Sequence, residues 1–287
     1  MPELPEVEIV KRSLENKVKN KKIRKVIITN RNLRFKIHRK FANILKGKFI
    51  VNIERFSKYI ILTLDDKSYC LIHLGMSGTL HILNNNKKKG ITNLSFYHSP
   101  NIPKKHNHVY IFFDKFKIIY NDPRRFGFFK ILNNKSDYLR FFTRIGPEAI
   151  SKDFNKKYLS KILKNRTKNI KNLLLDQKLV SGLGNIYVNE ILFQAKINPF
   201  KKSYLINLDE NKRIVKYSKI ILNKAIRFGG SSIRDFKGIT GKSGNFQSEF
   251  KVYDRAKKRC SRNKCSGQIR RKIISNRSTF ICSVCQK

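Results

Sequence analysis

Residues Tyr59–Leu74 read YIILTLDDKSYCLIHL, and this stretch indicates the fold of the first half of the chain. Two apolar runs rich in β-branched and aromatic residues flank the polar turn Asp65-Asp66-Lys67, as in two strands joined by a short turn. Similar runs recur at short spacing on both sides and predict an all-β sandwich or barrel. The expected strands are Lys25–Thr29, Lys48–Arg55, Tyr59–Leu64, Ser68–Leu74, Leu80–Leu83, His108–Phe113, Lys117–Asn121 and Phe126–Leu132.

Helical periodicity precedes and follows this β-rich part. Val7, Ile9, Val10 and Leu14 predict a short helix over 7–16. After residue 135 the apolar residues return at spacings of three and four, which predicts a helical second half. The expected helices contain Tyr158–Leu163, Ile170–Leu174, Ile186–Leu192 and Ile214–Phe228.

The charge of the chain constrains its partners. The 287 residues include 64 Lys and Arg against 19 Asp and Glu, a net charge of +45, which favours a polyanionic partner such as nucleic acid. Biased codon usage and solvated lysines are the alternative explanation of the excess. The apolar runs are far shorter than the ~20 residues of a membrane span, and the N-terminus lacks the features of a signal peptide. We therefore expect an intracellular protein that is not embedded in a membrane.

Four of the five cysteines form two pairs near the C-terminus, Cys260-x4-Cys265 and Cys282-x2-Cys285. This arrangement predicts one structural Zn²⁺ bound by four thiolates, with a β-hairpin between the pairs. A disulfide pair is the alternative, which a reducing cytosol disfavours. Residues 251–287 hold twelve Lys and Arg and one acid, so the finger is expected to present cations to phosphate, with Arg277 as the best candidate. The isolated Cys70 is expected to be a core residue.

The N-terminal sequence Met1-Pro2-Glu3 suggests unusual chemistry. Removal of Met1 would expose a secondary amine at Pro2, and an α-amino group titrates near ~8, so part of it is unprotonated at neutral pH. Such an amine can condense with an aldose carbon to give an iminium, and Glu3 would stand beside it as a proton shuttle. The alternative is an ordinary helix start in which proline and the acids, including Glu6, occupy their usual places.

Six motifs together resemble the bacterial formamidopyrimidine-DNA glycosylase family. They occur in the family's order and span nearly the whole chain, and their combination is specific. One departure is the first thiol pair, which has four intervening residues where the family usually has two. The motifs are Pro2–Glu6, Ser57–Tyr59, His73–Gly78, Asp122–Gly127, Gly182–Tyr187 and the four-cysteine finger.

The resemblance implies an α+β multidomain fold: an N-terminal β-sandwich, a helix–two-turn–helix domain and a C-terminal β-hairpin zinc finger. The expected boundaries are 2–132 for the catalytic sandwich, 133–150 for a linker, 151–250 for the helical domain and 251–287 for the finger. Residues 231–246 would form a loop that covers the extruded base.

The resemblance also implies an activity: excision of oxidised purines from damaged double-stranded DNA, followed by β,δ-elimination at the abasic site. Pro2 would be the nucleophile and Glu3 the proton-transferring acid. Lys58 would contact the phosphate of the lesion nucleotide, and Glu6 would support the terminus.

Further residues are expected to bind the DNA. Met76, Arg124 and Phe126 would fill the space left by the flipped base, because an opened duplex needs an apolar wedge and a donor for the orphaned partner base. Locally, Met76 and Phe126 could equally be core residues, and Arg124 a surface cation. DNA contacts are also expected from His106, Lys171, Asn185 and Arg277.

Two alternatives stay open at this point. The endonuclease VIII branch uses the same amine chemistry on oxidised pyrimidines, although Leu4 and the intact Arg124 and Phe126 favour purines. A non-catalytic zinc-containing binder of nucleic acid would explain the charge and the finger but leaves Pro2-Glu3 without a role.

The resemblance also implies where the protein acts. We expect a monomer in the bacterial cytoplasm, associated with the nucleoid.

Overall fold

The computed structural model describes residues 2–84, 103–231 and 245–286. The chain divides into two compact units. Unit 1 comprises Met1–Phe142 and Phe228–Asn245, and unit 2 comprises Thr143–Arg227 and Phe246–Lys287. Of this second stretch, the described residues 228–231 and 245 thus belong to unit 1, whereas the boundaries expected from the sequence placed them in 151–250.

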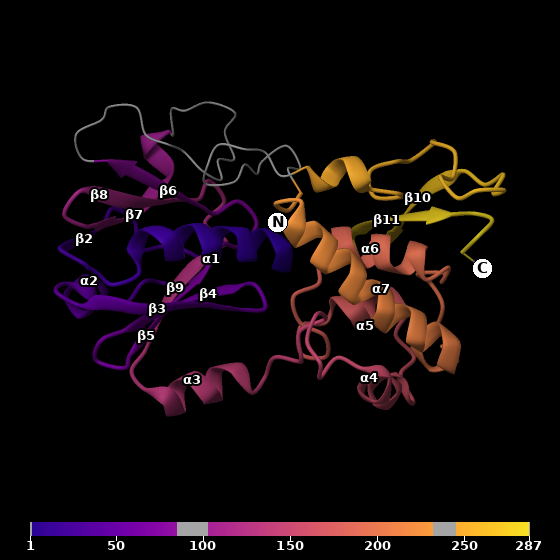
Figure 1. Cartoon of the computed structure of the whole chain (residues 1–287), viewed down its shortest axis with the longest axis horizontal. Coiled ribbons are helices and arrows are strands. Elements are labelled where there is room, and N and C mark those ends of the chain that lie inside the picture. The colour runs from indigo at the N-terminus through magenta and orange to yellow at the C-terminus, as the bar shows by residue number, and fades with distance from the viewer. Residues whose placement is uncertain (1, 85–102, 232–244, 287) are drawn as a thin grey trace. The chain divides into compact units, whose positions relative to one another are not determined.

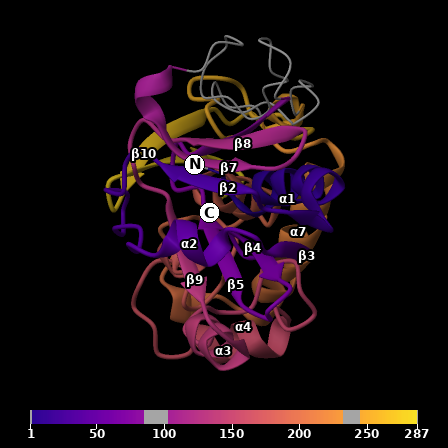
Figure 2. The same ribbon diagram turned by 90° about the vertical axis from the view of Figure 1, so that its left-hand side faces the viewer.

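Unit 1 contains two antiparallel sheets that enclose one apolar core. The five-stranded sheet has the order β1-β3-β4-β5-β9 and the four-stranded sheet the order β2-β7-β8-β6. Figures 1 and 2 show them as two layers. The strands are β1 (Lys21–Lys22), β2 (Lys25–Ile28), β3 (Phe49–Phe56), β4 (Tyr59–Leu64), β5 (Tyr69–His73), β6 (Thr79–Asn84), β7 (Asn107–Phe112), β8 (Phe116–Asn121) and β9 (Phe128–Leu132).

The first helix of unit 1 is positioned by its apolar face. Helix α1 (Leu4–Val18) packs against β3 and β4, and Val7, Val10 and Leu14 are buried in the core of the sandwich. Burying one such side chain contributes about 1.5–3 kcal/mol, so this face holds the N-terminus of the chain in place. Of the sandwich or barrel expected from the β-branched and aromatic runs, the structure forms a sandwich.

Two short helices of unit 1 lie where no helix was expected: α2 (Phe41–Leu45) and α3 (Lys135–Phe142). Helix α3 falls within the expected linker 133–150, yet it contacts β9, and its aromatic residues pack against rings of β3 and β5. Phe142 lies against Phe56 with ring centroids 5.0 Å apart. The first part of this segment therefore belongs to the sandwich unit, because its apolar side chains cover the outside of a sheet.

Unit 2 begins as a helical domain and ends in a hairpin. Its helices are α4 (Lys156–Leu163), α5 (Ile170–Leu175), α6 (Asn185–Gln194) and α7 (Leu208–Arg227), and its strands are β10 (Ile269–Ile274) and β11 (Arg277–Cys282). Asn155 and Asn169 cap α4 and α5 by accepting a backbone N–H through their side chains. Among the described residues, no helix has both the length and the apolar character needed to cross a bilayer.

Buried hydrogen bonds attach the hairpin to the helical part of unit 2. The carboxylate of Glu190 in α6 accepts hydrogen bonds from the backbone N–H groups of Lys251, Val252 and Tyr253 at 2.8–3.1 Å. Asn189 Oδ1 accepts from Phe280 N–H in β11 at 2.8 Å. These contacts fix the start and the second strand of the finger on one helix.

Candidate functional site

The N-terminus is held by a buried carboxylate. Pro2 and Glu3 are buried directly before α1. Glu6 in the first turn accepts a hydrogen bond from Glu3 N–H through Oε2 at 2.9 Å, and its Oε1 accepts from both N–H and Oγ of Ser231 at 2.9 Å. Because Glu3 N–H belongs to the peptide that joins Pro2 to Glu3, Glu6 fixes the orientation of that peptide. Met1 lies outside the described residues.

Lys58 lies in the tight turn between β3 and β4. The preceding residue, Ser57, has a φ of 56°, in the left-handed region, and Lys58 is only 6% exposed. The positive charge of Lys58 affects the pKa of His73 in β5. Burial, together with the charges of Lys58 and Arg34, lowers this pKa to about 4. His73 is therefore neutral at pH 7, and its Nδ1 accepts a hydrogen bond from Gly75 N–H at 3.1 Å.

The three expected wedge residues are on the surface. Met76 is 41% exposed and Phe126 43% exposed, and Arg124 is exposed as well, so the alternative that Met76 and Phe126 are core residues is wrong. The guanidinium carbon of Arg124 lies 4.7 Å from the centre of the Phe126 ring, a cation–π arrangement. Exposed apolar side chains on two neighbouring turns can contact a base stack, and the stacked Arg124 adds a hydrogen-bond donor.

The buried carboxylate of Asp122 connects the two turns that carry these residues. Its Oδ1 accepts from Ser77 Oγ at 2.6 Å and from Arg124 N–H at 3.3 Å. Its Oδ2 accepts from Tyr120 OH at 2.8 Å and from Gly127 N–H at 2.9 Å. Asp122 thus fixes residues next to both Met76 and Phe126 in one hydrogen-bond network.

Two glycines bring these turns into close contact. A Cβ on Gly127 would lie 1.8 Å from Tyr120 Oη, and a Cβ on Gly75 would lie 2.4 Å from Gly127 N. Gly75 also has a φ of 64°, which favours glycine. The glycines of both motifs are therefore required by packing, and they allow the turns to form one rigid surface.

In unit 2, side chains at the N-terminal ends of α5 and α6 donate hydrogen bonds to the same backbone carbonyl of the finger hairpin, that of Ser278. Lys171 Nζ donates to Ser278 O at 2.9 Å and to Thr279 Oγ1 at 2.8 Å, and Asn185 Nδ2 donates to the same Ser278 O at 3.0 Å. Lys171 is fully buried, whereas the sequence led us to expect it at the DNA surface. The ammonium would have to leave these acceptors to reach a phosphate.

The other expected DNA contacts are at the surface. Arg277 is exposed at the start of β11, directly after a hairpin turn in which Ser275 and Asn276 have positive φ angles. His106 is half-buried at the end of a short 3₁₀ helix before β7. Most of the expected base-covering loop, 232–244, lies outside the described residues.

The four C-terminal cysteines form a thiol cluster. All four Sγ atoms lie within 4.8 Å of one another, with 3.9 Å between Cys260 and Cys285 and 3.7 Å between Cys265 and Cys282. All four of these cysteines are free thiols, so the disulfide alternative is wrong. Four thiolates about 2.3 Å from a tetrahedral Zn²⁺ would lie about 3.8 Å apart, so the cluster fits this ion. Cys70 is buried in the core as expected.

Several residues that form the hydrogen-bond networks of this site were not predicted from the sequence. The motifs contained Asp122 and Ser77, and Tyr120 lies just before one of them, but the spacing alone assigned them no role. Ser231 was noted only as the start of a glycine-rich segment, because nothing local links it to Glu6. Polar residues that become buried through long-range contacts give little signal in a sequence pattern.

Comparisons with known proteins agree with this arrangement. The family description "Formamidopyrimidine-DNA glycosylase N-terminal domain" matches residues 1–129, and "Formamidopyrimidine-DNA glycosylase H2TH domain" matches residues 145–237. Formamidopyrimidine-DNA glycosylases of Wolbachia pipientis subsp. Culex pipiens and of Roseobacter denitrificans are each 40% identical to this chain, over the full length of both chains.

Similar solved structures include two complexes with DNA. A point mutant of the Lactococcus lactis glycosylase bound to DNA containing Fapy-dG has a TM-score of 0.88 and 34% identity. The Lactococcus lactis enzyme bound to abasic-site DNA has a TM-score of 0.88 and 33% identity. In both cases all of this chain and all of the other chain are covered.

Proposed function

Because the chain belongs to the formamidopyrimidine-DNA glycosylase family, we propose that it excises oxidised purines from duplex DNA and then cleaves the abasic strand. The observation that carries this proposal is the fixed Pro2–Glu3 peptide, buried at the start of α1 and hydrogen-bonded to Glu6. A nucleophile that replaces a base at C1′ must be held within a few tenths of an ångström, and this anchoring supplies that precision.

The chemistry begins with the secondary amine of Pro2 after removal of Met1. Its nitrogen attacks C1′ of the damaged nucleotide, the base leaves, and an iminium forms between Pro2 and the opened sugar. Glu3 donates a proton to the sugar ring oxygen and moves protons during the two eliminations that release the flanking phosphates. Lys58 contacts the phosphate of the lesion nucleotide, and Glu6 supports the terminus.

Excision also requires the base to leave the stack. Met76, Phe126 and Arg124 enter the duplex, where the apolar side chains replace stacking and Arg124 donates to the orphaned base. Their exposure and the rigidity of the Asp122 network support this role. His106, Asn185 and Arg277 contact the DNA, while Lys171 acts through the finger hairpin to which it is bonded.

The thiol cluster holds one structural Zn²⁺ through Cys260, Cys265, Cys282 and Cys285. A site closed by four thiolates leaves no position for a catalytic water, so the ion stabilises the finger and takes no part in the reaction. The chain would act as a monomer on damaged DNA in the bacterial cytoplasm, where the DNA of the bacterial relatives lies.

The test is borohydride reduction during reaction with abasic duplex DNA, followed by peptide mapping of the trapped adduct. The expected cross-link is at Pro2. Retaining a residue ahead of Pro2 should abolish trapping, because an amide nitrogen is not a nucleophile, while Pro2→Gly should keep some reactivity. A cross-link at Lys58 or another lysine would overturn the mechanism. Duplexes with oxidised pyrimidines serve as the comparison, and faster excision from them would favour the endonuclease VIII alternative.

A further inference from the structure

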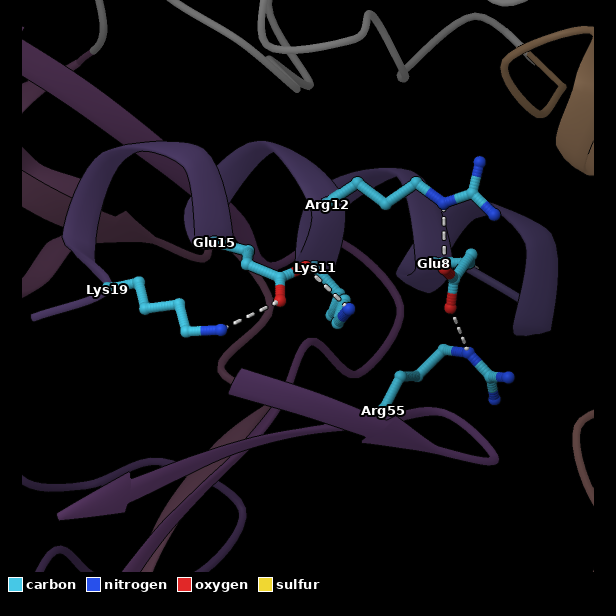
Figure 3. Close-up of polar contacts among 6 residues, drawn as sticks. All are labelled: Glu8, Lys11, Arg12, Glu15, Lys19 and Arg55. Carbon is cyan, nitrogen blue, oxygen red and sulfur yellow. Dashed lines mark hydrogen bonds and ion pairs between the residues drawn. The ribbon is translucent and has the colours of Figure 1, made fainter. Parts of the chain in front are cut away.

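A pair of charged residues connects the two parts of the proposed active centre within unit 1. Glu8 lies on α1, and Arg55 lies near the end of β3. Arg55 Nε donates to Glu8 Oε2 at 2.8 Å, as Figure 3 shows. Arg55 and Glu8 side chains are only 9% and 15% exposed. This pair is much less exposed than an ordinary surface ion pair, which contributes little to stability.

The same guanidinium makes a second contact, and this one orients the peptide bond that precedes Lys58. Arg55 Nη1 donates to Ser57 O at 2.9 Å. This carbonyl is half of the peptide between Ser57 and Lys58, and Ser57 has a φ of 56°. A residue held in the left-handed region costs on the order of 1–2 kcal/mol, so the turn needs a contact that stabilises it. The bond to Ser57 O supplies one and orients the peptide that precedes Lys58.

Glu8 provides the countercharge for this arrangement. Its other oxygen, Oε1, accepts from Arg12 Nε at 2.8 Å, so both oxygens are occupied by arginines. Hydrogen bonds and charges from Arg55 and Arg12 outweigh burial and lower the pKa of Glu8. A guanidinium as buried as that of Arg55, with a side chain only 9% exposed, would be costly without such a partner.

We propose that Arg55, held by Glu8, is a positioning residue for Lys58, and that it links α1, which Pro2 and Glu3 directly precede, to the Lys58 turn. This inference rests on the proposed function. The planar fork of arginine is necessary, because one nitrogen engages Glu8 while another engages Ser57 O. Lysine at this position would keep the charge but could not hold both acceptors in the same geometry.

The test compares Arg55→Lys with two controls on α1 that do not touch Ser57. Arg12→Ala removes the other partner of Glu8, and Glu15→Gln breaks the ion pair with Lys11 on the same helix. Single-turnover excision of 8-oxoguanine should fall by about 10- to 100-fold in Arg55→Lys, as for a misplaced catalytic group. Affinity for duplex DNA containing a tetrahydrofuran abasic analogue should fall no further than it does in Lys58→Ala, because the phosphate contact of Lys58 is the interaction that Arg55 positions.

A double-mutant cycle separates positioning from general destabilisation. If Arg55 acts through Lys58, Arg55→Lys should cost nothing further in a Lys58→Ala background, whereas independent effects would multiply. Multiplying effects, or wild-type excision by Arg55→Lys, would overturn the inference while leaving the glycosylase function intact. A wild-type chain that neither excises the base nor is trapped by borohydride would instead refute the proposed function, and this inference with it.

Discussion

The carboxylate of Glu6 is hydrogen-bonded to both the backbone N–H and the hydroxyl of Ser231, although 225 residues separate them in the sequence. The other carboxylate oxygen of Glu6, Oε2, accepts a hydrogen bond from Glu3 N–H. Close packing accompanies these bonds, since a Cβ on Gly230 would lie 3.3 Å from Glu6 Oε1. One buried carboxylate therefore fixes both the N-terminal peptide and the distant Ser231.

Glu6→Gln should disrupt this junction. The amide group of glutamine would place N–H donors against Ser231 N–H or Glu3 N–H, and an unsatisfied buried donor costs about 1–3 kcal/mol. We expect a lower Tm and slower single-turnover excision. Ser231→Ala is the matched control, because it removes one hydroxyl and keeps the backbone bond, so its loss should be smaller. An excision rate as low in Ser231→Ala as in Glu6→Gln would contradict this division of roles.

The wedge residues should affect excision more than strand cleavage. In Phe126→Ala or Arg124→Ala, removal of 8-oxoguanine from duplex should fall further than cleavage of a preformed abasic site, which avoids the few kcal/mol needed to unstack a base. Phe35→Ala, which truncates another exposed phenylalanine of unit 1, should leave both rates unchanged. Equal losses on both substrates would show that Phe126 and Arg124 only support the fold.

The sequence predicted the sandwich because its strands are short runs rich in β-branched and aromatic residues separated by turns, and it predicted the thiol cluster because ligand spacing is a local property. It did not predict that Lys171 is buried. Its neighbours Ile170 and Leu173 are plainly apolar, but the acceptors of the ammonium, Ser278 O and Thr279 Oγ1, lie more than a hundred residues away. The Arg55 contact with Glu8 was missed for the same reason, since neither residue has a distinctive local pattern.

Zinc removal should unfold the finger. Chelation or Cys282→Ser should remove the ion and expose Ile269 and Phe280, which pack around the cluster, because metal binding and folding are coupled in so small a unit. We expect loss of bound zinc, faster proteolysis within 251–287 and weaker binding of duplex DNA. Cys70→Ala is the control, and it should retain the metal. Full DNA affinity in metal-free protein would refute the structural role.

Acid should destabilise unit 1 partly through His81. Its Nε2 lies 2.8 Å from Thr79 Oγ1, and burial lowers its pKa from 6.5 to about 4. Between these values the unfolded chain binds the proton and the folded chain does not, so stability falls as the pH drops from 6.5 towards 4. The free energy of unfolding, measured in urea at several pH values, should therefore depend less steeply on pH in His81→Gln. The difference in slope should be up to about 1.4 kcal/mol per pH unit over this range. An unchanged slope in His81→Gln would contradict the assignment.

Arg277 and Lys171 should differ in how they affect the salt dependence of DNA binding. Each cation that neutralises a phosphate contributes about −0.9 to the slope of log K against log salt concentration, so Arg277→Ala should make that slope shallower by about one unit. Lys171→Met should leave the slope near the wild-type value, because the buried ammonium is bonded to Ser278 O and Thr279 Oγ1, and should instead lower the thermal stability of the finger. Fluorescence anisotropy with an undamaged duplex over a salt series measures both slopes. If Lys171→Met flattened the slope as much as Arg277→Ala, Lys171 would have to leave the hairpin on binding and meet a phosphate directly.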